Sequence, residues 1–222
     1  MRPIIQLPNK NNTSLYVANL IAERMNFSIE EIGLSDLDNI NTLIENKDAA
    51  LLIIGLNSNK EIQSYLNKCR ELRIPYIFVK NEIPNNFNIE NILLPITNLE
   101  EEREKGPFSS SFARHFNCPI TIYQPKDYGS KAATNIEAMK VLFDSLSLKY
   151  IVKKGEKDSN GIELEAGLLN NNTQNNILII SASRDYGLDD IVFGPKERKI
   201  IKNTNIPTML INPRGDLYAL CD

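Results

Sequence analysis

The chain has 222 residues and a formal net charge of −3, with 25 Lys and Arg against 28 Asp and Glu, so its charge gives no general attraction to nucleic acid or anionic membranes. With 42% hydrophobic residues and no apolar run long enough to cross a bilayer, the composition is that of a globular protein. The residues from Met1 to Pro8 are too few, and too interrupted by proline, for a signal peptide. We therefore expect a cytoplasmic protein that binds neither nucleic acid nor membranes.

Nine short apolar runs with helical spacing between them predict an α/β fold, in which helices cover both faces of a mostly parallel sheet. The predicted strands are residues 3–7, 28–33, 49–55, 75–79, 92–96, 119–123, 150–153, 176–182 and 207–211. The clearest predicted helix spans residues 129–146. Its apolar side chains recur at three- and four-residue steps and predict one buried stripe, made of Ala132, Ile136, Met139, Phe143 and Leu146.

The sequence repeats itself in order, which predicts two related halves at residues 1–85 and 90–215. The apolar strand before Gly55 resembles the one at 177–181, and the phrase around Pro75 resembles the one around Pro207. The second half is longer, because 112 positions separate Pro95 from Pro207 whereas 67 separate Pro8 from Pro75. The surplus matches the helix and strand at 129–153 in size, so we expect the first half to lack one helix–strand unit.

Residues for catalysis or metal binding are scarce. The single histidine, His115, lies beside an apolar stripe of the helical segment 108–116, and no hydrolase, kinase or zinc-protease motif is present. Three cysteines without a C-x-x-C pair predict free thiols rather than a disulfide framework or a zinc site. The acidic run 100–104 predicts a solvated first helical turn, and Gly106 followed by Pro107 predicts a kink or a helix that begins at Pro107. We expect no catalytic residue and no metal site, and hence no enzyme.

In order and spacing, these segments resemble the universal stress protein family, in particular its tandem members with two copies in one chain. The likeness rests in the second half on the opening 92–97, the strand 177–181, a long loop that ends at Gly194, and the last strand 205–211. It implies two Rossmann-like units with five-stranded, mostly parallel sheets, the first one reduced. In the family the last strands of two copies pair at a dimer interface. The resemblance therefore implies an intramolecular pseudo-dimer, whose interface residues would be Pro75, Ile77, Val79, Pro207, Met209 and Ile211.

Nucleotide-binding members of the family hold ATP with an Asp two residues after the opening proline and with a loop of pattern G-x2-G-x9-G-[ST]. Glycines allow backbone N–H groups to approach phosphates at a helix N-terminus. In this chain the corresponding positions hold Thr97, Ser181, Arg184, Gly194 and Pro195, so only one of the five expected residues is kept. Pro195 also removes a backbone donor.

Two functions follow from the resemblance. The leading expectation is a stress-response regulator that acts through an unknown protein partner, without catalysis, without the family's usual ATP binding and without a required cofactor; two such chains could also form a homodimer. The alternative is an adenine-nucleotide sensor or slow ATPase that binds ATP or AMP through a variant cradle of Thr97, Ser181, Arg184, Gly194 and Pro195.

Overall fold

A computed structural model describes residues 1–84, 86–127, 129–171, 175–183 and 195–214. These residues form one nine-stranded sheet with the order β2-β1-β3-β4-β9-β8-β5-β6-β7. All nine predicted strands are confirmed, with ends that differ from the predicted ones by at most two residues. The strands are β1 (Pro3–Leu7), β2 (Ser28–Glu31), β3 (Leu51–Gly55), β4 (Tyr76–Val79), β5 (Asn91–Pro95), β6 (Ile120–Gln124), β7 (Tyr150–Lys154), β8 (Asn176–Ser181) and β9 (Thr208–Ile211).

Helices cover both faces of the sheet, as the uninterrupted apolar strands require. The residues of one buried cluster come from the first face together with α1 (Thr13–Met25), α4 (Lys105–Phe116) and α5 (Ser130–Ser145). A second cluster joins the opposite face to α2 (Ile40–Asn46), α3 (Ile62–Cys69), α6 (Ile162–Leu169) and α8 (Lys196–Asn203). Two 3₁₀ helices, η1 (Leu34–Asn39) and η2 (Glu100–Glu104), precede α2 and α4.

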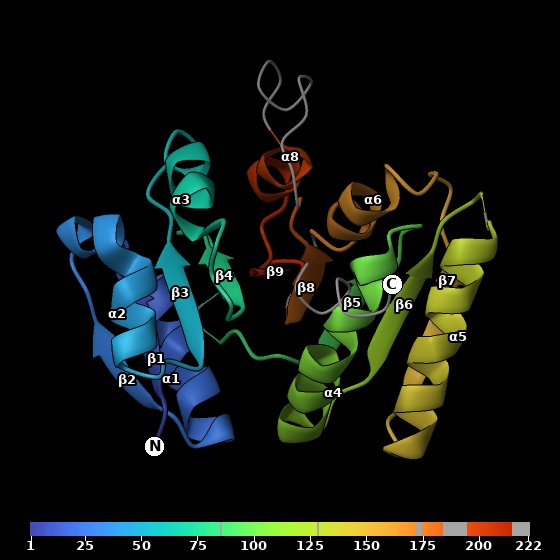
Figure 1. Ribbon diagram of the computed structural model, residues 1–222, viewed down its shortest axis with the longest axis horizontal. Helices are drawn as coiled ribbons and strands as arrows, with labels where there is room; N and C mark the ends of the chain where they lie inside the picture. Colours follow the sequence, from blue (N-terminus) through green and yellow to red (C-terminus); the bar gives the residue numbers. More distant parts are fainter. Residues whose placement is uncertain (85, 128, 172–174, 184–194, 215–222) are drawn as a thin grey trace.

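The first four strands and the last five lie side by side and meet at β4 and β9 (Figure 1). All neighbouring strands run parallel except this pair, which is antiparallel, with Ile77 opposite Met209 and Tyr76 opposite Leu210. Tyr76 also donates from its hydroxyl to Asn212 Oδ1 at 3.0 Å. The two strands that were expected to approach each other are therefore hydrogen-bonded neighbours. Beyond the strands shared in order, the second part carries α5 and β7 at its outer end.

Two helix details differ from the prediction. The stripe on α5 is buried from Ala132 to Phe143, but Leu146 follows the end of the helix and is 38% exposed. Helix α4 begins at Lys105 rather than at Pro107. Proline is tolerated there because the N–H groups of the first helical turn have no partner within the helix.

Several sequence expectations outside the sheet are confirmed. His115 is exposed on the flank of α4, where its Nδ1 lies 2.8 Å from the carbonyl oxygen of Ser111. Cys69 and Cys118 are buried free thiols, while Cys221 lies outside the described residues. Within the described part of the chain, none of the helices has the length and apolar character of a membrane span.

Candidate functional site

A cleft of about 570 Å³ lies at the carboxyl ends of β5 and β8. In the sheet β5 lies between β6 and β8, so the chain continues from β5 to β6 on one side and later returns to β8 on the other side. Ligands of open α/β sheets bind at the carboxyl ends of the strands where the strand order changes direction in this way. Polar and apolar side chains both line the cleft, and the polar ones include Thr97, Asn98, Asp127, Ser159, Ser183 and Lys196.

A buried ion pair lies beside the loop that follows β5. Lys105 Nζ is 2.5 Å from Glu102 Oε2, and both side chains are fully buried. The ammonium also donates to the carbonyl oxygen of Pro95 at 2.5 Å, and the carboxylate accepts the backbone N–H of Thr97 at 2.9 Å. The prediction of a solvated acidic turn is therefore wrong for Glu102: residues 100–104 form a 3₁₀ helix that turns this side chain inward.

Side chains from two other elements fix the same loop. Asn135, from α5, donates through Nδ2 to the carbonyl oxygens of Thr97 at 3.3 Å and Leu99 at 2.7 Å. The backbone N–H of Asn98 donates to Ser159 Oγ at 2.7 Å, so the loop after β7 is tied to the loop after β5. The rim of the cleft is thus held by internal hydrogen bonds.

Glu197 is a buried carboxylate at the start of α8. It is the second residue of the helix and is buried, and its carboxylate accepts the backbone N–H of Ser183 and, at 3.0 Å, the hydroxyl of the same residue. Burial raises the pKa of Glu197, and the hydrogen bonds from Ser183 oppose that increase. A backbone donor that could bind an anion is occupied by the protein's own carboxylate.

Lys196, the cation nearest to this helix start, is also engaged. Its Nζ lies 2.9 Å from Glu163 Oε2, and its side chain is 31% exposed whereas that of Glu163 is buried. Burial lowers the pKa of Lys196, but attraction to the carboxylates, first of all Glu163, outweighs it and leaves the pKa raised. Lys196 therefore stays charged and paired within the cleft wall.

The same arrangement recurs along this edge of the sheet. After β7, Glu165 accepts the backbone N–H groups of residues 156–157 at 2.8 Å each. After β3, Glu61 accepts those of residues 57–58 at 2.8 and 3.2 Å. We call the carboxylates that bind backbone N–H groups at the carboxyl ends of the strands the edge carboxylates; they are Glu61, Glu102, Glu165 and Glu197.

In the first half, side chains fill the space at the carboxyl end of β1, the position that corresponds to the cleft beside β5. Asn9 is buried and donates through Nδ2 to Thr13 Oγ1 at 2.7 Å and to the carbonyl oxygen of Val79 at 3.4 Å. Gly55 approaches it so closely that an added Cβ would lie 2.6 Å from the backbone nitrogen of Asn9 and from Ser14 Oγ. The end of β3 thus packs directly against the loop after β1.

Of the five residues that the sequence grouped as a nucleotide site, the structure describes Thr97, Ser181 and Pro195. Thr97 lines the cleft, whereas Ser181 is buried in β8 with a hydroxyl that has no partner among the described residues. Pro195 is the residue immediately before α8, not its first helical residue. Arg184 and Gly194 lie outside the described residues. Within the described ranges, no three His, Cys, Asp or Glu side chains are grouped as metal ligands.

No protein-family model and no curated protein matches this sequence. Solved structures do match over most of the chain. A universal stress protein from Archaeoglobus fulgidus DSM 4304 aligns with a TM-score of 0.63 and 13% identity, covering 92% of this chain and 76% of that one. The chain has the universal stress protein fold.

Two proteins from Pseudomonas aeruginosa give the same result. One, from strain PAO1, is of unknown function and aligns with a TM-score of 0.56. The other, from strain UCBPP-PA14, is provisionally named a universal stress protein and aligns with a TM-score of 0.57. Each is 13% identical and covers 98% of this chain, which in turn spans 84% of either protein. At this identity the likeness concerns the fold.

The edge carboxylates were missed by sequence reasoning. Each lies in or beside the first turn of the helix that follows its strand, as Glu61 does before α3 and Glu197 does in α8. Acidic residues are common in such turns because of the helix dipole. Their position is a usable signal, but only the folded loop shows which N–H groups they reach.

Proposed function

We propose that the protein is a non-catalytic stress-response regulator of the universal stress protein type, which acts by binding a protein partner and does not hold ATP as nucleotide-binding members do. The observation that carries this proposal is the set of edge carboxylates. A phosphate is bound by free backbone N–H groups of a loop and of the helix start that follows it. Here Glu197 and Glu102 occupy the N–H groups of Ser183 and Thr97, in the loops after the two strands that frame the cleft.

Charge in the cleft supports the same conclusion. Lys196 is paired with Glu163, and Asp127 also lines the cleft, with its Oδ1 accepting the N–H of Ser159 at 2.9 Å. A triphosphate would have to displace one of these internal carboxylates or lie beside them. Like charges in a partly buried site repel each other strongly, so binding of ATP would be weakened.

We also propose that the two parts are duplicated halves that form an intramolecular pseudo-dimer. The antiparallel pairing of β4 with β9 supports this, because each is the last strand of its part. Contacts between α3 and α8, and between α1 and α4, lie on either face of the junction and join helices of matching order. The first half would then be the copy that lacks α5 and β7.

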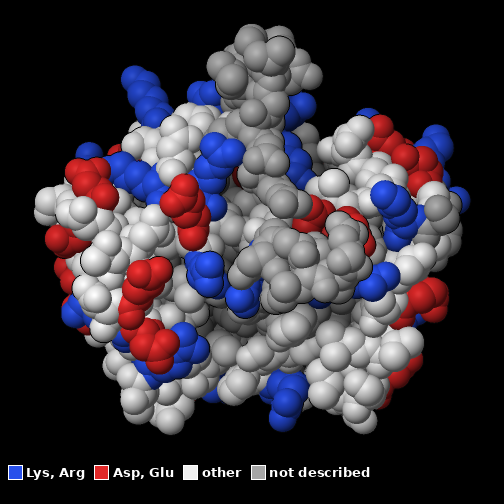
Figure 2. All heavy atoms as spheres, in the orientation of Figure 1, with Lys and Arg blue, Asp and Glu red and all other residues white. Residues whose placement is uncertain are grey.

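A protein partner fits the surface charge better than nucleic acid does. Figure 2 shows Lys and Arg interspersed with Asp and Glu on the face that it presents. Nucleic-acid binding needs basic residues concentrated in a patch or stripe, and the net charge of −3 does not favour it.

The test is to purify the full chain and measure nucleotide binding directly. We expect no absorbance from copurified adenine nucleotide and no thermal shift with millimolar ATP-Mg, while a nucleotide-binding universal stress protein treated in parallel gives both signals. Saturable stabilisation of this chain by ATP-Mg would contradict the proposal. Light scattering of the same sample shows whether two chains form a homodimer.

The alternative is an adenine-nucleotide sensor or slow ATPase that uses ATP or AMP. The observation that favours it is the size of the cleft, about 570 Å³, which is within the range of small-molecule sites. This function predicts a thermal shift of several degrees with ATP-Mg that is lost in Arg184→Ala. A shift that Arg184→Ala leaves unchanged would contradict the variant cradle.

A further inference from the structure

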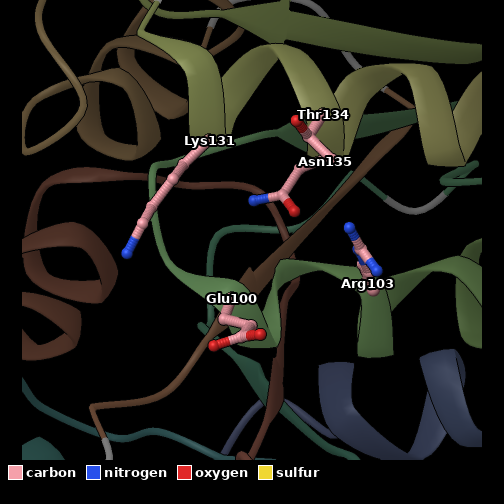
Figure 3. A pocket seen from close by; sticks show the side chains of 5 residues that line it. All are labelled: Glu100, Arg103, Lys131, Thr134 and Asn135. Atoms are coloured by element: carbon pink, nitrogen blue, oxygen red, sulfur yellow. The ribbon is translucent and has the colours of Figure 1, made fainter.

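A second hollow, of about 320 Å³, lies between η2 and the first turns of α5 and shares no lining residue with the cleft. Figure 3 shows its side chains converging from the two elements. Glu100 and Arg103 come from η2, and Lys131, Thr134 and Asn135 come from α5. A volume of this size is at the lower end for ligand pockets, so a small molecule fits better than a nucleotide.

Two cations line the hollow from opposite sides, with Glu100 and Asn135 between them (Figure 3). Arg103 and Lys131 are exposed, and neither makes an ion pair with a described residue. Lys131 lies in the first turn of α5, which contains no acidic residue, so its charge adds to the positive end of the helix dipole. The guanidinium of Arg103 can hold a carboxylate through two parallel hydrogen bonds. The Arg103 side of the hollow therefore favours a carboxylate.

The hollow also presents two acceptors. Glu100 is exposed and makes no ion pair with a described residue. Asn135 is only 3% exposed; its Nδ2 is used by the carbonyl oxygens of Thr97 and Leu99, and in the described part of the chain no group donates to its Oδ1. An amide oxygen accepts hydrogen bonds, and a protonated amine could donate to it and to the Glu100 carboxylate.

We propose that this hollow binds a small zwitterion of the amino acid class. Its carboxylate would bind Arg103, and its ammonium group would bind Glu100 and the Oδ1 of Asn135, while Lys131 adds positive charge on the opposite side of the hollow. A simple anion would make no use of the two acceptors, and a simple amine would make no use of Arg103. Because this site is separate from the cleft, the proposal goes beyond the proposed function and does not depend on the absence of ATP binding.

The test is calorimetric titration and thermal shift of the full chain with each of the common L-amino acids in turn. Acetate, inorganic phosphate and ethylamine serve as probes that carry charge of one sign only. We expect saturable binding of at least one amino acid, and no binding of these three probes at the same concentration. The proposal is overturned if no amino acid binds, or if acetate or phosphate binds as tightly as the best amino acid.

Variants locate the binding. Arg103→Gln and Glu100→Gln should each weaken binding of that amino acid by about tenfold or more, because each removes a charged hydrogen bond. Arg114→Gln, at an exposed arginine near the end of α4, is the matched control and should bind as the wild type does. All three positions are exposed, so thermal unfolding without ligand should be unchanged. Wild-type affinity in Arg103→Gln would refute the site.

Discussion

Replacement of Lys105 by methionine tests the buried ion pair beside the cleft. In Lys105→Met, the Glu102 carboxylate keeps only the N–H of Thr97, at 2.9 Å, and the carbonyl of Pro95 loses its donor. Loss of one partner of a fully buried pair costs about 3–5 kcal/mol, because the other charge stays buried without compensation. For a chain of this size each kcal/mol lowers Tm by about 2–4 °C. We therefore expect Tm to fall by about 6–20 °C.

The matched control is Lys140→Met. Lys140 and Glu137 form an ion pair with the same i,i+3 spacing at 2.6 Å, but their side chains are 32% and 60% exposed. Exposed pairs contribute about 0–1 kcal/mol, so this variant should unfold close to the wild type. Circular dichroism gives Tm and urea titration gives the free energy of unfolding. Equal losses in the two variants would refute the burial of Glu102 and Lys105.

Three further predictions concern packing, protonation and thiol reactivity. Gly55→Ala should destabilise the protein by about 1–3 kcal/mol, because the new Cβ meets the backbone of Asn9, whereas Gly33→Ala, whose nearest neighbour is 3.6 Å away, should not; urea titration of both decides. The raised pKa of Glu197 means that its carboxyl group binds a proton more tightly in the folded than in the unfolded state. The contribution of Glu197 to the free energy of unfolding therefore falls as pH rises above 4.5, the ordinary pKa of a glutamate. Glu197→Gln should abolish that part of the pH slope, and a wild-type contribution that grows with pH would contradict the assignment. Burial raises the pKa of Cys69 to about 12, so peptide mass spectrometry should find it unlabelled by iodoacetamide until the protein unfolds.

The strands were predictable because buried parallel strands are continuous apolar runs, which sequence shows directly. The pairing of β4 with β9 was reached through the internal repeat and the family resemblance rather than from either strand alone. Helix ends were less certain, as Lys105 and Leu146 show. Proline inside a first turn looks like a helix start, and an apolar residue one step past a helix end keeps the spacing of the stripe.

The chemistry of the sheet edge was not predictable in the same way. Glu102 belongs to a run of acidic residues, a pattern that predicts a solvated turn. Its burial depends on a 3₁₀ helix and on Lys105, three residues later. Glu197 reaches Ser183, which is 14 residues earlier, and Glu165 reaches the N–H of Glu156, which is nine residues earlier. These separations follow from loop geometry and have no fixed sequence spacing.

Isothermal titration of ATP-Mg into the full chain measures whether the protein's own carboxylates occupy the donors that would bind phosphate. We predict no saturable heat at millimolar nucleotide. A saturable isotherm with one ATP per chain and a micromolar Kd would contradict it.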